Sequence, residues 1–215
     1  MHDWDISLIE PSDLTWAFRD STCRWHGPDS YSAALDPTPA YQHDQDVIAE
    51  TLDHVITCAP LPWPGTIWLS PHEEISRTNG WSGRSTRYDE ETEKWVVDRG
   101  VIFFSAKRIP PHPAVTRYLV AHEYGHQANY LIAEQQGVEY TDIAKDYAGM
   151  RGLDWNDGKY GAGTWHSSAV EVLACDFRLV VTGVEPDYWP HPGIERPGRD
   201  VERWWSDHFA ARAAA

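Results

Sequence analysis

The feature that most constrains this 215-residue chain is a long, almost uncharged segment around the sequence His-Glu-Tyr-Gly-His. Across residues 118–133 the only formally charged side chain is Glu123. Pro113 suits the first turn of a helix and Gly137 suits the position after its last turn, so the pattern predicts one long, buried helix. Burying a carboxylate is costly unless a partner or a metal ion compensates its charge. The predicted helix therefore needs a site that accepts Glu123.

His122 and His126 lie four residues apart, so on a helix both imidazoles share one face and can reach a single ion. Zinc hydrolases use this H-E-x-x-H spacing: two histidines and a third protein ligand bind the metal, and water takes the last position. Glu123 lies beside that position and can pass a proton from water to a leaving amine. The alternative is that both histidines are core residues and Glu123 is solvated. Gly125 favours the metal site, because a glycine inside a helix usually admits close packing or a ligand.

A third metal ligand has to come from outside this helix. The metzincin continuation of the motif is excluded, because its glycine and third histidine would fall at Asn129 and Ile132. A second helical pattern, over residues 167–181, offers Glu171 within the sequence Glu-Val-Leu-Ala. Glu171 has a second interpretation, since Ser168-Ala-Val-Glu is also a capping box, in which serine and glutamate satisfy backbone donors at a helix start.

The two motifs together resemble those of the glutamate-ligand (gluzincin) class of zinc peptidases. H-E-Y-G-H followed by E-V-L-A-C-D-F-R-L is similar to the paired motifs H-E-F-G-H and E-x-x-A-x-x-F of the anthrax lethal factor and Pro-Pro endopeptidase group. A more distant similarity is to ImmA/IrrE-type metallopeptidases. The resemblance implies one zinc ion per chain, held by His122, His126 and Glu171, with Glu123 as general base and a peptide or protein as substrate.

The resemblance covers residues 101–182, and it implies that an extended substrate lies along a strand such as residues 101–105. The family supplies a tyrosine about two turns before the glutamate to stabilise the oxyanion. Thr164 occupies the corresponding position in this chain. Tyr160 and His166 are the nearest residues that could serve instead, and both are candidates for a catalytic role.

Two residues close to the second motif are open to interpretation. Asp176 could orient a ligand histidine by accepting a hydrogen bond from its second ring nitrogen, or it could be a charge on the helix surface. Cys175 is expected to be a small buried residue and not a ligand.

The rest of the chain predicts a sheet followed by helices. Helical spacing predicts helices over residues 44–58, 142–147 and 200–213, and β-rich runs predict strands over residues 66–69, 84–88, 94–97 and 101–105. We therefore predict an α+β fold: a minimal gluzincin-like domain in which a small, mainly antiparallel sheet packs on the central H-E-x-x-H helix and the second ligand-bearing helix.

Composition and periodicity indicate the domain organisation and argue against some classes of partner. Residues 1–42 show little periodicity and are predicted to be an irregular N-terminal arm with a short helix near residues 13–18, and residues 43–215 are predicted to form a single metallopeptidase domain. The formal net charge of −15 argues against nucleic acid or an anionic membrane as a partner, because both require a basic face. Without a signal peptide, a membrane span or a disulfide pattern, the expected location is cytoplasmic.

The predicted function is zinc-dependent hydrolysis of peptide bonds. The alternative is a catalytically silent, metalloprotease-like protein that serves in binding or structure. The intact Glu123 favours the enzyme, because this residue is needed only for the chemistry.

Overall fold

The computed structural model describes a set of helices and strands with gaps between them. It covers residues 6–8, 18–19, 25–26, 40–59, 61, 66–70, 80–89, 91, 94–105, 113–155, 165–185 and 189–213. The α-helices are α1 (Ala40–Cys58), α2 (Pro113–Gln136), α3 (Tyr140–Arg151), α4 (Ala169–Asp176) and α5 (Arg199–Ala213). The strands are β1 (Ile6–Leu8), β2 (Phe18–Arg19), β3 (Trp25–His26), β4 (Thr66–Ser70), β5 (Gly80–Asp89) and β6 (Lys94–Ser105).

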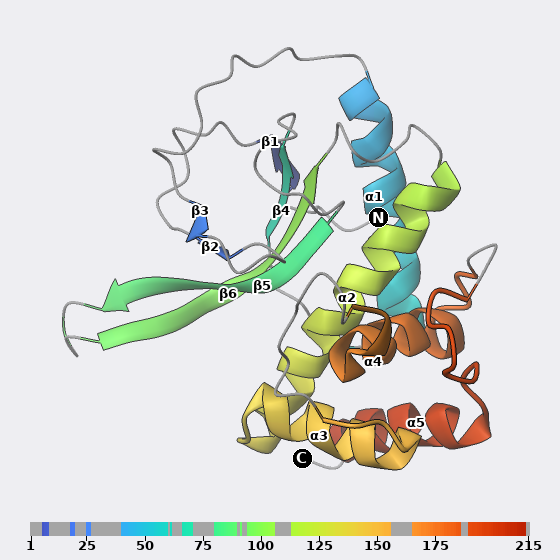
Figure 1. Cartoon of the computed structure of the whole chain (residues 1–215). Helices are drawn as coiled ribbons and strands as arrows, with labels where there is room; N and C mark the ends of the chain where they lie inside the picture. The colour runs from blue at the N-terminus through green and yellow to red at the C-terminus, as the bar shows by residue number, and fades with distance from the viewer. Residues whose placement is uncertain are drawn as a thin grey trace.

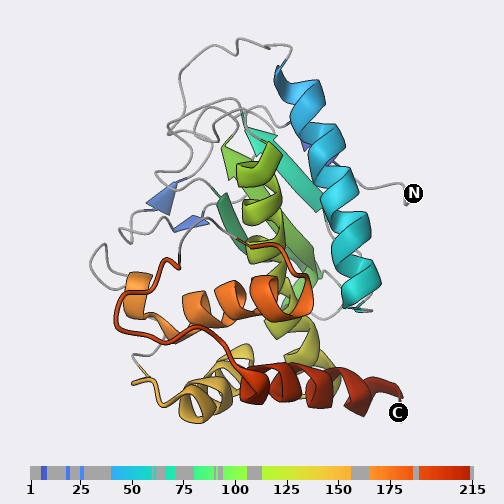
Figure 2. The ribbon, with the colours of Figure 1, turned by 90° about the vertical axis from the view of Figure 1, so that its right-hand side faces the viewer.

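The long central helix predicted around the H-E-x-x-H motif is α2. It starts at Pro113, whose missing N–H costs nothing in a first turn, and Gly137 follows its end with a φ of 65°. Most of residues 119–133 are buried. Helix α1 runs beside α2, and α4 crosses it (Figures 1 and 2). The stretch of α2 that carries no charge except Glu123 is therefore also the stretch that neighbouring elements bury.

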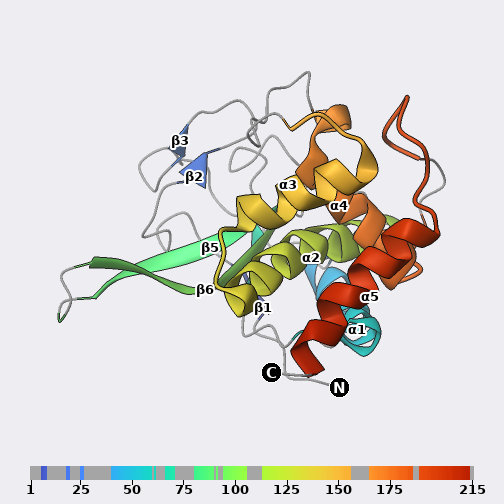
Figure 3. The same ribbon diagram turned by 90° about the horizontal axis from the view of Figure 1, so that it is seen from below.

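Helices α3 and α5 lie at the C-terminal end of α2, as Figure 3 shows from below. The indole N–H of Trp204 donates a hydrogen bond to an Asp146 carboxylate oxygen over 2.8 Å, and the rings of Trp204 and Tyr147 meet edge to face. These contacts join α5 to α3. Within the described residues, no helix is both long and apolar enough to cross a membrane.

Four of the strands form one sheet in the order β1-β4-β6-β5, and β2 and β3 form a separate pair. Strands β1 and β6 both run parallel to β4, and β5 and β6 pair antiparallel as a long hairpin (Figure 1). The hairpin contains one register shift, between Ser85 and Thr86. Residues 101–105 are the end of β6, which pairs there with β4 over all five residues and with β5 as far as Phe104.

The predicted α+β fold with a mainly antiparallel sheet packed on the central helix is wrong. Two of the three pairings in the sheet are parallel. The described part of the chain is mostly helical. Helices α1, α3 and α4 pack on α2, and β5 contacts it through Gln127, so most of the neighbours of the motif helix are helices. The sequence pattern predicted strands within β4, β5 and β6 but not β1, and it could not show which elements would cover the motif helix.

Other predicted elements differ mainly in their ends. Helix α1 starts four residues before the predicted residue 44, and α3 extends beyond residues 142–147 at both ends. The second ligand-bearing helix is split into α4 and a π-helical turn, η4 (Phe177–Val181). Most of the short helix predicted near residues 13–18 falls outside the described residues. Strand β1, from the predicted irregular arm, pairs with β4.

Candidate metal centre

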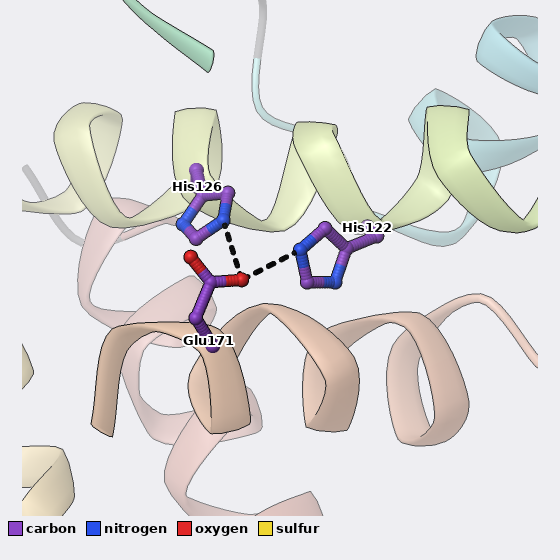
Figure 4. Close-up of side chains that lie close together, drawn as sticks. All are labelled: His122, His126 and Glu171. Atoms are coloured by element: carbon purple, nitrogen blue, oxygen red, sulfur yellow. Dashed lines mark hydrogen bonds and ion pairs between the residues drawn. The ribbon is translucent and has the colours of Figure 1, made fainter. Parts of the chain in front are cut away.

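Two adjoining helices bring His122, His126 and Glu171 together. The two histidines project from one face of α2, and Glu171 projects from α4 towards them (Figure 4). Oε2 of Glu171 lies 3.1 Å from Nε2 of His122 and 3.6 Å from Nε2 of His126. One ligand atom from each residue lies within 4.8 Å of the other two. The three residues therefore form a group that could hold a metal ion.

The geometry of the group fits a small divalent ion. Ligand atoms bound about 2.0–2.1 Å from a tetrahedral ion such as zinc are about 3.3 Å apart. The two Oε2 to Nε2 distances, 3.1 and 3.6 Å, lie on either side of that value. The imidazole rings stand perpendicular, with centroids 5.0 Å apart, so the two nitrogens approach a common point from different directions. Two imidazoles and a carboxylate are donors that zinc commonly uses.

Burial and mutual contact set the charges of the three residues. Burial lowers the pKa of His122 to about 4, although its hydrogen bond with Glu171 acts in the opposite direction. Burial alone would raise the pKa of Glu171, but His126 and the hydrogen bonds from both histidines lower it below its ordinary value. Burial acts to lower the pKa of His126, but the carboxylates of Glu171 and Glu123 raise it overall. The group thus combines a neutral His122 and an ionised Glu171 with a His126 that would give up any proton to a bound metal, because metal ions require neutral imidazoles and ionised carboxylates as ligands.

Glu123 lies next to the metal-ligand group and is also buried, with 6% of its surface exposed. Burial raises the pKa of Glu123 to about 8, against the opposing influence of His126. Gln127, one turn further along α2, shares a helix face with Glu123. The Gln127 amide donates hydrogen bonds to Oγ of Ser82, over 2.6 Å, and to the carbonyl oxygen of Gly83, over 2.9 Å. Glu123 therefore lies on the side of α2 that faces β5.

The capping-box interpretation of Glu171 does not match the structure. Ser168 is the N-cap of α4, but its side chain makes no capping hydrogen bond. Its hydroxyl is buried and has no hydrogen-bond partner among the described residues. The Glu171 carboxylate turns towards α2, where it contacts both histidines. Tertiary contacts therefore take precedence over the local cap.

The structure resolves the two open interpretations beside Glu171. Asp176 is fully buried, accepts a hydrogen bond from the Tyr147 hydroxyl, and forms an ion pair with Arg151, whose Nε lies 2.9 Å from the Asp176 carboxylate. It is therefore neither a surface charge nor a partner of a ligand histidine. Cys175 is buried as predicted, but its sulfur lies 3.3 Å from Nδ1 of His122, a contact that was not predicted. The spacing held a signal, since Cys175 follows Glu171 by one helical turn and shares its face.

Of the two candidates for the oxyanion, only His166 is among the described residues, and it is not part of the metal-ligand group. Tyr160 lies outside the described residues. His166 is exposed, in a short 3-10 turn before α4, and its Nδ1 donates a hydrogen bond to the carbonyl oxygen of Pro190 over 2.6 Å. A neutral ring that donates through Nδ1 has no proton left on Nε2 to offer an oxyanion. His191, in turn, donates from Nδ1 to the backbone carbonyl of His166 over 2.9 Å. The catalytic roles of Tyr160 and His166 stay predictions.

Comparison of the chain with protein families, with curated proteins and with solved structures finds no match. The functional argument therefore depends on the geometry and chemistry of the metal-ligand group.

Proposed function

We propose that the protein is a zinc-dependent metallopeptidase. One observation carries the proposal: a buried His122-His126-Glu171 group with Glu123 beside it on the same helix. A purely structural zinc site uses four protein ligands, whereas a catalytic site uses three and leaves a position for water or substrate. The described residues supply three ligands, which favours the catalytic type.

The roles of the side chains follow from their charges and positions. Zinc, when bound, would lower the pKa of a coordinated water and polarise the scissile carbonyl. His122, His126 and Glu171 would hold the ion, and Glu171 would offset part of its charge. Glu123 would accept a proton from the attacking water and donate it to the leaving amine.

An extended peptide is the substrate that the surroundings support best. Strand β5 is the last strand in the order of the described sheet, so one of its edges has no partner strand there. Gln127 fixes this strand to the face of α2 that also carries Glu123. A peptide can add to such an edge through main-chain hydrogen bonds. The segment that the resemblance implied, residues 101–105, is less suited, because both edges of residues 101–104 are already paired.

The test is hydrolysis of a peptide library by the purified protein before and after removal of the metal. We expect cleavage that a chelator abolishes and that stoichiometric zinc restores. Cleavage that persists in the metal-free protein would contradict the proposal. Zinc binding without cleavage of any peptide would instead favour the alternative of a catalytically silent, metalloprotease-like binding protein.

A further inference from the structure

The ring of His122 has two nitrogens, and the metal centre uses only one of them. Nε2 lies against Glu171, whereas Nδ1 lies 3.3 Å from Sγ of Cys175. Both His122 and Cys175 are buried. A neutral imidazole that binds a metal through Nε2 carries its proton on Nδ1, and a buried N–H group needs an acceptor. In the described part of the chain, the acceptor that this nitrogen contacts is the sulfur of Cys175.

We infer that Cys175 is a positioning residue of the metal centre: its sulfur accepts the Nδ1–H of His122 and so keeps Nε2 directed at the ion. This inference rests on the proposed function. A histidine that binds a metal usually donates its second N–H to a carboxylate, a backbone carbonyl or water, and this bond fixes the tautomer and the ring orientation. In this protein a thiol would take that place.

A thiol is a weak acceptor, so the surrounding side chains have to hold it in position. Tyr118, one turn before His122 on α2, stacks on its imidazole with the ring planes 3° apart. The guanidinium carbon of Arg178 lies 4.2 Å from the centroid of the Tyr118 ring. Arg178 is fully buried and belongs to the π-helical turn that directly follows α4. These contacts form a closed layer behind His122 and give its ring little freedom to rotate.

The sequence spacing supports the same conclusion. Cys175 follows Glu171 by four residues, so both side chains leave α4 on the face that meets α2. Glu171 then contacts Nε2 of His122 from one side, and Cys175 contacts Nδ1 from the other. One helix face thus constrains both nitrogens of the same ligand.

Measuring zinc affinity distinguishes a hydrogen-bond acceptor role of Cys175 from simple packing. We expect Cys175→Ala to weaken zinc binding between tenfold and a hundredfold, as the loss of an outer-shell partner typically does. Cys175→Ser should stay within about threefold of the wild type, because a hydroxyl also accepts a hydrogen bond. Cys58→Ala is the matched control, since Cys58 lies on α1 with its sulfur 3.7 Å from the ring of His54, which is not a metal ligand. It should leave zinc affinity unchanged.

The position of the proton gives a second readout that packing alone would not change. In the zinc-loaded wild type, long-range proton–nitrogen NMR correlations should place the His122 proton on Nδ1, with slow exchange against water. Exchange should accelerate in Cys175→Ala and slow again in Cys175→Ser. If Cys175→Ala does not fold, the location of this proton in the wild type and in Cys175→Ser decides the question.

Three results would overturn the inference: a His122 proton on Nε2 in the zinc-loaded protein, an affinity of Cys175→Ala within twofold of the wild type, or equal losses in the alanine and serine variants. If the wild type binds no zinc at all, the proposed function fails and this inference fails with it. That result is distinct from a loss confined to the Cys175 variants.

Discussion

Gly125 of α2 lies directly against the backbone of Ala174 in α4: a Cβ atom added at Gly125 would stand 2.8 Å from the Cα of Ala174 and 3.0 Å from its carbonyl oxygen. This is closer than Cβ contacts normally allow, so the absence of a side chain sets how near the two helices come. The glycine belongs to the H-E-x-x-H motif and the alanine to the E-x-x-A motif. Their contact therefore sets the distance between the two histidines and Glu171.

Gly125→Ala should push α4 away from α2 and weaken zinc binding by at least tenfold. Overpacking against a backbone typically costs about 1–3 kcal/mol, which exceeds the gain of about 1 kcal/mol from replacing a helical glycine by alanine. Zinc titration and thermal unfolding measure the two effects. Gly149→Ala in α3 is the control, because nothing lies within 4 Å of its added Cβ. It should stabilise the protein slightly and leave zinc affinity unchanged; equal behaviour of both variants would contradict the role of the close approach.

Glu171→Ala should abolish tight zinc binding, because only two protein ligands would remain. Ser168→Ala should leave the affinity nearly unchanged, since the Ser168 hydroxyl makes no capping hydrogen bond. Competitive zinc titration compares the two variants. Equal affinities, both close to the wild-type value, would remove Glu171 from the metal centre.

Glu123→Gln should lower kcat by about 10²–10⁴-fold while the protein keeps its zinc. The amide cannot accept a proton, and general base catalysis typically contributes this factor. Steady-state kinetics and metal analysis on the same sample provide the two readings. Glu134→Gln, at an exposed position nearer the end of α2, is the control and should remain active. Full activity of Glu123→Gln would mean that another group accepts the proton.

Purified protein should contain one zinc ion per chain, and a chelator should lower its melting temperature. A ligand present at about 100 times its dissociation constant stabilises the state that binds it by about 2.7 kcal/mol. Metal analysis gives the stoichiometry, and thermal unfolding with and without chelator gives the shift. A preparation without any near-stoichiometric divalent ion, or a melting temperature that zinc does not raise, would argue against the metal centre.

Asp176 should make the stability of the fold depend on pH. Burial raises its pKa to about 6, although Tyr147 and Arg151 act in the opposite direction. The folded state therefore holds this proton more tightly than the unfolded chain, whose aspartates titrate near pH 3.9. The stabilising contribution is complete below about pH 4 and is lost as the pH rises through about 6.

The matched variant is Asp176→Asn, which cannot ionise. Its unfolding free energy relative to the wild type should rise between pH 4 and 7, by on the order of 2–3 kcal/mol. Denaturant titrations of the metal-free proteins at several pH values measure this difference. A difference that is constant with pH would show that the pKa of Asp176 is the same in the folded and unfolded states.

Local sequence rules predicted the features of the fold that depend on residues close together in the sequence. Pro113 and Gly137 fix where α2 starts and ends, because one lacks an amide proton and the other accepts a positive φ. The four-residue spacing of His122 and His126 places both on one helix face, whatever surrounds the helix. Turn and β-rich residues likewise located β4 and the hairpin, though with shorter boundaries than the structure has.

Long-range packing decided what those rules could not. Whether Glu171 caps its own helix or faces the histidines depends on α4 lying against α2, which is a contact between residues about fifty positions apart. Strand β6 lies between β4 and β5 in the sheet, and β4 in turn pairs with β1 from the predicted arm. Neither relationship is encoded in a local pattern.

The sequence by itself therefore determined the helix that carries the H-E-x-x-H motif and the chemical types of the ligands. Tertiary structure alone decided that Cys175 lies behind His122 and that Asp176, the next residue, pairs with Tyr147 and Arg151. Successive residues on a helix point about 100° apart, so these two side chains face different neighbours. Which neighbour each one meets depends on how α2 and α3 pack around α4, and only the folded chain fixes that arrangement.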